Sequence, residues 1–207
     1  MSDVELEPAV AAELFGDRID VARAFTAALA REGEERGLIG PLELPRLWTR
    51  HILNSVIAAP LFEGRVADIG SGAGLPGLVL GIARPDVEWT LVEPMERRVT
   101  WLNEQVDALG LTNVTVLRSR AEDVRSPGGF DVVTARAVSA LRTLIPITAP
   151  LVRDGGELTL LKGMNAANEI EAAQKQIKKF RLTDVRVEVL GEGVLPETTR
   201  VVRARVR

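Results

Sequence analysis

The chain has 207 residues, a formal net charge of -3 and 46% hydrophobic residues, so it supports one main core with little room for two full domains. The absence of cysteine excludes disulfides, thiolate metal sites and covalent thiol catalysis, and the single histidine argues against most zinc sites and Ser-His-Asp triads. No apolar run approaches the roughly 18 residues that span a membrane, and the start is acidic where a secretory signal is basic, so we expect a soluble, cytoplasmic protein without a metal.

The N-terminal part is predicted to be helical. From Pro8 to Ala30, apolar residues recur at helical spacing with acidic residues between them, which predicts one or two amphipathic helices. The stretch Gly33–Gly40 interrupts this pattern, and a second helical stripe runs from Leu47 to Val56. We therefore expect residues 1–64 to form a helical cap.

From Arg65 the pattern alternates short β-rich runs with longer helical segments, which is typical of a parallel sheet wrapped by helices. The predicted strands are Val66–Ile69, Val87–Val92, Val114–Leu117, Phe130–Thr134 and Glu157–Leu161, and the predicted helices are Leu75–Ala83, Glu96–Leu109, Ser139–Leu151 and Ala166–Lys179. Residues 182–190 and 198–206 alternate with period two and predict an antiparallel hairpin that ends the sheet. Residues 65–207 are expected to form one Rossmann-like α/β domain with a mostly parallel, seven-stranded sheet.

A glycine loop follows the first predicted strand. Gly70, Gly72 and Gly74 precede a Leu- and Ile-rich helix, as in the first β-turn-α unit of a nucleotide-binding sheet. Without Cβ atoms, this loop can turn at positive φ and let a ligand approach backbone amides at the helix N-terminus. Gly72, Gly74 and Gly77 also satisfy the dinucleotide pattern G-x-G-x-x-G, so two cofactors compete here.

Three acidic residues at predicted strand tips favour an adenosyl ligand. Asp68 lies two residues before Gly70, where a carboxylate opposes a pyrophosphate but favours the ammonium and sulfonium of S-adenosylmethionine. Glu93 can accept the ribose hydroxyls of either cofactor, and Glu122 can accept the adenine amine. Each acid has a structural alternative, with Asp68 bracing the loop and Glu122 at a helix N-terminus. Together they predict S-adenosylmethionine as the cofactor.

The absence of cysteine and of one typical loop motif narrows the range of possible methyl acceptors. Zero cysteine excludes pyrimidine carbon methyltransferases that need a thiolate, and also cluster-dependent radical chemistry. The segment 130–137 lacks the Asn/Asp-Pro-Pro-aromatic loop typical of enzymes that methylate exocyclic amines. Candidate bases are few, which suits a nitrogen whose lone pair is available without a general base.

Five short motifs then point to one family. They are Arg50-His-Ile-Leu-Asn-Ser55, Asp68-Ile-Gly-Ser-Gly-Ala-Gly-Leu-Pro-Gly77, Ser119-Arg-Ala-Glu122, Ala135-Arg-Ala137 and Leu161-Lys-Gly163. In this order they resemble the RsmG (GidB) family, which methylates the N(7) of a guanine in small-subunit (16S) ribosomal RNA. The resemblance covers roughly residues 40–207, while the family's upstream Trp-Asn and Asn-Leu-Thr segments are replaced by Gly33–Pro41.

The resemblance implies a class I methyltransferase fold and a role for each matching residue. The cofactor would contact Gly70 and Leu75 on its methionine and ribose side, Ala121 and Glu122 at adenine, and Arg136 at the border with the target base. Arg136 and Lys162 are the implied catalytic residues. Lys162 and Arg200 would contact RNA phosphate or the guanine edge, with His51 nearby, and these side-chain types suit such contacts.

Several charged residues keep a simpler interpretation. A lone histidine such as His51 is more often a hydrogen-bonded structural residue than a catalyst. Arg97 and Arg98 begin a helix whose solvent face ordinarily carries such charges. The cluster Lys175–Arg181 holds four cations at a predicted helix end, where they either complement the helix dipole or steer RNA.

Guanine N(7) faces the deep major groove of A-form RNA, so the target must lie in a loop or an opened helix. With 4% aromatic residues and no tyrosine, the chain lacks an evident base-stacking platform, so we expect the ribosomal particle to supply much of the specificity to a monomeric enzyme.

Two alternatives stay open at this point. One is an NAD-dependent oxidoreductase that uses the second glycine pattern with Glu93 on the ribose, although it lacks a recognisable hydride-transfer acid. The other is a non-catalytic protein for RNA binding or ribosome assembly.

Overall fold

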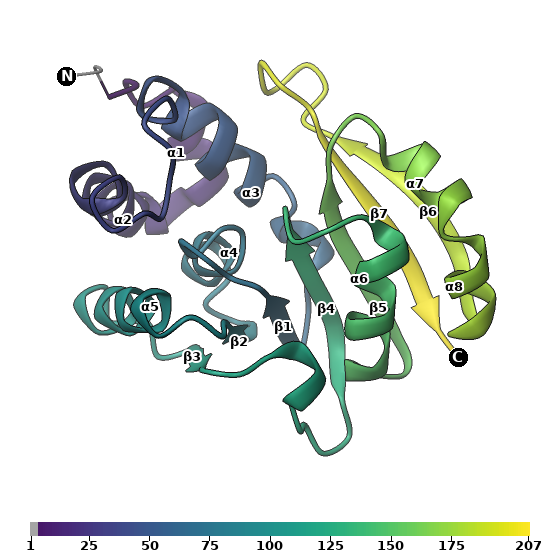
Figure 1. Ribbon diagram of the computed structural model, residues 1–207. Coiled ribbons are helices and arrows are strands. Elements are labelled where there is room, and N and C mark those ends of the chain that lie inside the picture. Colours follow the sequence, from purple (N-terminus) through teal and green to yellow (C-terminus); the bar gives the residue numbers. More distant parts are fainter. Residues whose placement is uncertain (1–3) are drawn as a thin grey trace.

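The computed structural model describes residues 4–207, and a seven-stranded sheet forms their centre (Figure 1). The strand order is β3-β2-β1-β4-β5-β7-β6, with β7 antiparallel to both of its neighbours. The mostly parallel sheet with a terminal hairpin is therefore confirmed. The strands are β1 Arg65–Ile69, β2 Glu88–Val92, β3 Val114–Leu117, β4 Phe130–Arg136, β5 Val152–Lys162, β6 Leu182–Leu190 and β7 Thr199–Val206.

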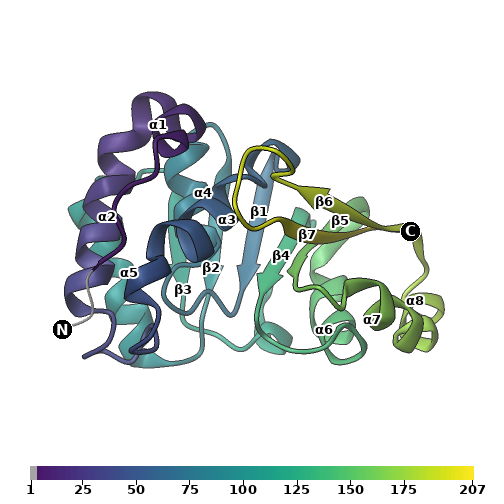
Figure 2. The ribbon, with the colours of Figure 1, turned by 90° about the horizontal axis from the view of Figure 1, so that it is seen from above.

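Helices cover both faces of this sheet. Figure 2 shows α1 and α2 on the same side as α4 and α5, while α6, α7 and α8 lie beyond β4 and β5. The α-helices are α1 Val10–Phe15, α2 Ile19–Glu32, α3 Asn54–Val56, α4 Gly77–Ala83, α5 Glu96–Ala108, α6 Leu141–Thr148, α7 Ala166–Ala172 and α8 Gln174–Lys179. Short 3-10 turns are η1 Gly16–Arg18, η2 Leu44–Arg46, η4 Ala59–Leu61, η5 Ala121–Asp123 and η6 Ala149–Leu151, and η3 Leu47–Leu53 is a π-helix. Within residues 4–207, none of the helices has the length and apolar character required to cross a membrane.

The alternation of side chains along β1 divides the buried core between the two faces. Val66 packs toward the N-terminal helices and α4, whereas Ala67 and Ile69 pack toward α6 to α8. This follows from the period of two in a strand, which sends successive side chains to opposite faces. A sheet buried on both faces fits the nearly uninterrupted apolar character of this strand.

The segment before β1 shares the first of these cores. Phe25 and Leu29 of α2 are completely buried, and the Phe25 ring lies 6.5 Å from the ring of Trp101 in α5. Burying an aromatic or leucine side chain contributes about 1.5–3 kcal/mol. The predicted helical character of this segment is confirmed, and the boundary at residue 64 stays a prediction.

Element ends differ from the predictions where proline or glycine governs the backbone. The helix expected from Leu75 begins at Gly77, directly after Pro76, because a proline disfavours the helical conformation in the residue before it. The helix expected over 139–151 ends at Thr148 and continues as η6, in which Pro150 cannot donate a helical hydrogen bond. The strand expected from Glu157 begins at Val152.

Candidate functional site

The glycine loop joins β1 to α4 and adopts the positive φ angles that its sequence predicts. Gly70, Gly72 and Gly74 have φ of 72°, 57° and 96°. A Cβ on Gly74 would lie 2.7 Å from the Cβ of Leu78, so a larger residue would clash with the following helix. All three positions favour glycine for backbone conformation, and Gly74 requires it for space as well.

The amides of this loop are bonded within the protein. Gly70 and Ser71 donate to the Val92 carbonyl, Gly74 and Leu75 to the Ser71 carbonyl, Gly72 to Glu93 and Gly77 to Asp68, at 2.8–3.2 Å. A pyrophosphate bound at such a loop relies on backbone N–H donors. With six of these donors already paired, the loop suits a ligand without phosphate. The expectation that a ligand contacts these amides is wrong for those six, because two carboxylates and two main-chain carbonyls already accept their hydrogen bonds.

Asp68 occupies the centre of this arrangement. Its carboxylate is completely buried, and its Oδ2 accepts the Gly77 amide at 3.0 Å. Oδ1 has no hydrogen-bond partner among the described residues. Burial raises the pKa of Asp68 to about 6, and the nearby positive charge of Arg136 works against that rise. Asp68 thus braces the loop with one oxygen and leaves the other unsatisfied, as a site that receives a cationic ligand would.

Glu93 lies at the tip of β2, as predicted, but it faces the protein. Its Oε2 accepts the Gly72 amide at 3.0 Å and its Oε1 accepts the Met95 amide at 2.9 Å, with the residue only 1% exposed. Arg98 approaches Oε2 at 3.8 Å. A carboxylate oxygen has two lone-pair directions, so the ribose contact stays a prediction beside this structural role.

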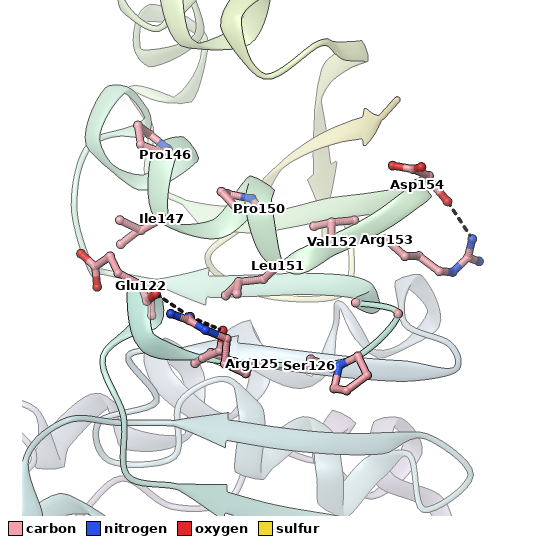
Figure 3. Close-up of a pocket in the computed structure, with 15 residues that line it drawn as sticks. Glu122, Arg125, Ser126, Pro146, Ile147, Pro150, Leu151, Val152, Arg153 and Asp154 are labelled. Atoms are coloured by element: carbon pink, nitrogen blue, oxygen red, sulfur yellow. Dashed lines mark hydrogen bonds between the residues drawn. The ribbon is translucent and has the colours of Figure 1, made fainter.

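The predicted adenine residues lie at one end of a cavity of about 840 Å³ (Figure 3). Ala121 is buried and Glu122 is exposed, both in η5. Arg125 donates to the main-chain carbonyls of Glu122 and Val124 and so holds this turn. The cavity continues between the loop after η5 and the segment 146–154, toward the amino ends of β4 and β5.

A second cavity, of about 760 Å³, lies at the carboxyl ends of β4 and β5. It brings together residues that are far apart in the sequence: the predicted substrate residues His51, Lys162 and Arg200, and Arg136, which is predicted to border both the cofactor and the target base. Asn54, Met164 and Glu169 join them. Because ligands bind at the carboxyl ends of parallel strands, this cavity stands where an acceptor would enter.

Arg136 ends β4 and is joined to the N-terminal segment. One of its terminal nitrogens, Nη2, lies 3.2 Å from Nδ1 of His51, whose Nε2 lies 2.6 Å from a carboxylate oxygen of Glu43. Burial lowers the pKa of Arg136 to about 10, so the guanidinium stays charged at neutral pH. Burial also lowers the pKa of His51, followed by the charge of Arg136. His51 is therefore hydrogen-bonded on both ring nitrogens, which fits the structural alternative and also places it against Arg136.

Lys162 and Arg200 lie opposite each other in the register of β5 and β7. The Lys162 ammonium contacts a carboxylate oxygen of Glu169 and the Ser139 carbonyl, both at 2.8 Å, and its side chain is 10% exposed. Arg200 is partly exposed and contacts the sulfur of Met164. Lys162 is thus engaged within the protein, whereas Arg200 lies nearer to solvent.

The remaining predicted cations are more peripheral. Arg97 is exposed on α5, and Arg98 lies near Glu93. All four cations of the cluster Lys175–Arg181 are exposed, and Lys179 lies over the ring of Phe180. In residues 4–207 no group of three His, Cys, Asp or Glu side chains is placed to hold a metal ion.

Two residues of the site, Glu43 and Glu169, were missed by sequence reasoning. Both are carboxylates that hold a predicted site residue, His51 and Lys162 respectively. Glu169 also accepts the Leu141 amide at 2.8 Å and so ties α7 to the start of α6. A pattern search for strand tips could not find them, because one precedes a helix and the other lies within one.

Comparisons with known proteins show the family to which the chain belongs. Residues 18–198 match the family described as GidB, rRNA small subunit methyltransferase G. Proteins called ribosomal RNA small subunit methyltransferase G from Leifsonia xyli and Clavibacter michiganensis are 67% and 65% identical. The first alignment covers 99% of this chain and 98% of the relative, and the second covers 98% and 97%.

Solved structures share the fold at low identity. The N-methyltransferase NodS of Bradyrhizobium japonicum, in complex with S-adenosyl-L-homocysteine, has a TM-score of 0.58 at 16% identity and covers 88% of this chain and 98% of its own. A SAM-dependent O-methyltransferase of Thermotoga maritima also has a TM-score of 0.58, at 15% identity, covering 86% and 71%. The fold is that of S-adenosylmethionine-dependent methyltransferases, and the chain belongs to the GidB family of small-subunit ribosomal RNA methyltransferases.

Proposed function

We propose that this protein transfers the methyl group of S-adenosylmethionine to N(7) of a guanine in small-subunit ribosomal RNA. One observation carries the proposal. Arg136 lines the cation-rich cavity at the tips of β4 and β5, and its charge also acts on the buried carboxylate of Asp68 beside the glycine loop. The edge that suits an adenosyl ligand and the cavity that suits RNA therefore adjoin at one side chain. Family membership supports a methyltransferase and neither of the two alternatives.

The residues present fit the cofactor. The unpaired Oδ1 of Asp68 offers a buried negative charge, and the paired amides of the glycine loop leave little for a phosphate. We propose that Gly70 and Leu75 hold the methionine and ribose side, with Glu93 behind the loop, and that Ala121 and Glu122 hold adenine. When bound, S-adenosylmethionine supplies a methyl group activated by its sulfonium.

The acceptor nitrogen shapes what the protein must do. Guanine N(7) has a lone pair and no proton to lose, so the site needs orientation and electrostatics rather than a general base. A donor on N(7) would occupy that lone pair, so we propose that Arg136 donates to the neighbouring O6 or to a phosphate. Arg136 then turns the base edge toward the glycine loop.

Arg200 and Lys162, the other two cations predicted in the cavity, are given different roles because they differ in exposure to solvent. Arg200, which lies nearer to solvent, is proposed to contact an RNA phosphate. Lys162 is proposed to act from its place between Ser139 and Glu169, where it holds the segment after β4. The assembled ribosomal particle is proposed as the substrate of a monomeric, cytoplasmic enzyme, since the chain has few aromatic residues on which to stack a splayed base.

The test is methyl transfer with labelled S-adenosylmethionine to small ribosomal subunits from a strain that lacks this protein. We expect incorporation at one guanine, mapped by cleavage at 7-methylguanine, and weak incorporation into naked ribosomal RNA and a short unstructured oligonucleotide. Calorimetry with S-adenosylmethionine and with NAD runs in parallel. If the protein binds NAD but not S-adenosylmethionine, the proposed function is contradicted. If the oligonucleotide is methylated as well as the small subunit, the proposed preference for the assembled particle is contradicted.

A further inference from the structure

Three side chains connect the start of η2 with the end of β4. Glu43 contacts Nε2 of His51 at 2.6 Å, and Nδ1 of His51 contacts Nη2 of Arg136 at 3.2 Å. All three are at least partly buried, with side-chain exposures of 20% for Glu43 and 14% for His51. The pairs are 8 and 85 residues apart in the sequence, so only the folded chain brings them together.

The chemistry of the two outer groups determines the state of the imidazole. A guanidinium can only donate hydrogen bonds, and an ionised carboxylate can only accept them. Nδ1 must therefore present its lone pair to Arg136, while Nε2 carries the proton and donates it to Glu43. A neutral imidazole with the proton on Nε2 satisfies both contacts, whereas a protonated ring would place an N–H against the guanidinium.

We infer that Glu43 is a positioning residue for methyl transfer. It acts through the neutral ring of His51, which holds the guanidinium of Arg136 in place at the cavity at the carboxyl ends of β4 and β5. This inference rests on the proposed function, because Arg136 is the residue that the proposal places against the guanine. Glu43 itself does not line the cavity, so it acts on the substrate only through its partners.

The surroundings of His51 support this chain of contacts. The charged groups that act on the ring are Arg136, Glu43 and Arg50, and Arg50 also lies 3.4 Å from a carboxylate oxygen of Glu43. Burial and the charge of Arg136 lower the pKa of His51, which keeps the ring neutral near pH 7. Arg136 in turn faces the negative charge of Asp68 beside the glycine loop. A shift of the imidazole would therefore move the guanidinium relative to both parts of the site.

A purely structural role for Glu43 is the competing explanation, since it also contacts Arg46 at 2.9 Å and Arg50 at 3.4 Å. Glu5 offers a matched control. Its carboxylate accepts the Thr49 amide at 3.0 Å, so it anchors the same π-helical segment without touching His51 or Arg136. Comparing Glu43→Ala with Glu5→Ala separates support of the segment from positioning of the arginine.

The first measurement is spectroscopic and needs no activity. Because His51 is the only histidine, nitrogen-15 histidine labelling reports its ring directly. We expect a protonated Nε2, an unprotonated Nδ1 and a slowly exchanging, downfield Nε2 proton in the wild type and in Glu5→Ala. In Glu43→Ala that proton resonance should be lost. A wild-type ring protonated on Nδ1 near pH 7 would overturn the inference.

The second measurement is steady-state methyl transfer to small subunits. Residues that orient a metal-binding imidazole typically contribute about 10–100-fold to activity, and because Glu43 orients an imidazole in the same way we expect Glu43→Ala to lower kcat about 10-fold. Affinity for S-adenosylmethionine, measured by calorimetry, should stay within about 2-fold, since the contacts of Glu43 go to Arg46, His51 and Arg50 and not to the glycine loop. Glu43→Gln, whose amide oxygen can accept the same proton, should recover most of the turnover.

The results for the two variants of Glu43 test its positioning role separately from the proposed function. Full kcat in Glu43→Ala, or an equal loss in Glu5→Ala, overturns the positioning role. Loss of kcat in Glu43→Gln while the Nε2 proton resonance persists overturns it as well. If the wild type fails to methylate any ribosomal substrate while the predicted imidazole signals are present, the proposed function fails instead.

Discussion

The glycine loop and the cation-lined cavity adjoin in space but are built in different ways. In the loop, buried carboxylates bond backbone amides only 9 and 21 residues away, Asp68 with Gly77 and Glu93 with Gly72. In the cavity, side chains bond across 85 residues between His51 and Arg136, and across 145 between Asn54 and Thr199. The glycine loop is therefore formed by contacts that are local in the sequence. The cation-lined cavity forms only when the N-terminal helices and the C-terminal hairpin pack together in the folded chain.

This difference has a functional consequence. A loop whose amides are already satisfied is preorganised, so ligand binding there needs little rearrangement. The cavity instead depends on partly exposed ionic contacts, each of which contributes modestly and responds to salt and substitution. We therefore expect cofactor affinity to be robust to changes in the cap and hairpin, and turnover on RNA to be sensitive to them.

The largest expected effect comes from Arg136, which belongs to both regions. Arg136→Ala should lower kcat on small subunits by about 100-fold, because a preorganised charged donor at the acceptor is lost. Arg136→Lys should recover little, since an ammonium lacks the planar fork. Arg142→Ala is the control, because Arg142 is an exposed arginine of α6, the helix that follows the same strand. Single-turnover methylation measures the effect, and near-wild-type turnover in Arg136→Ala would remove the link between the two regions.

Asp68 gives the second largest effect, on stability and its dependence on pH. Burial raises the folded-state pKa of Asp68 from the ordinary 3.8 to about 6, which corresponds to ~3 kcal/mol. Asp68→Asn keeps an oxygen for the Gly77 amide and removes the buried charge. Its free energy of unfolding should therefore exceed that of the wild type by up to ~3 kcal/mol at pH 8.

The sign follows from proton linkage. A raised folded-state pKa means that the native chain binds the proton more tightly, so the penalty is absent below about pH 4 and complete above about pH 6. The advantage of Asp68→Asn should shrink as pH falls through this window, as measured by urea unfolding at each pH. A constant difference would show that Asp68 is not the titrating group. Affinity for S-adenosylmethionine should fall in the same variant.

The two regions were also unequally accessible from the sequence. The glycine loop, Glu93 and Glu122 could be placed because a strand followed by a turn has a local pattern. The mostly parallel sheet and its terminal hairpin followed from the alternation of β-rich and helical periods. Glu43 and Glu169 could not be found, because their significance depends on contacts with His51 and Lys162 in other segments. Likewise, the paired state of the loop amides could not be inferred from glycine spacing.

Lys162 tests how the cavity is held together. If Lys162 acts by holding the segment after β4, removal of Lys162 or of its ion-pair partner Glu169 should lower kcat to the same extent. We expect Lys162→Ala and Glu169→Ala each to lower kcat about 10-fold, and the double variant to be no worse, because coupled residues are not additive. A loss of RNA affinity confined to Lys162→Ala would instead show a direct RNA contact. Filter binding and single-turnover rates distinguish the two.

The smallest effect is expected at Arg200, at the mouth of the cavity. Arg200→Ala should weaken binding to small subunits only a few-fold, and the slope of log affinity against log salt should fall by about 1, as for one lost phosphate contact. Arg205→Ala is a matched control, because Arg205 is an exposed arginine of the same strand that pairs with Glu157 rather than Lys162 in the register. An identical salt slope in both variants would place Arg200 outside the RNA interface and leave RNA contact to the cations deeper in the cavity, among them Arg136.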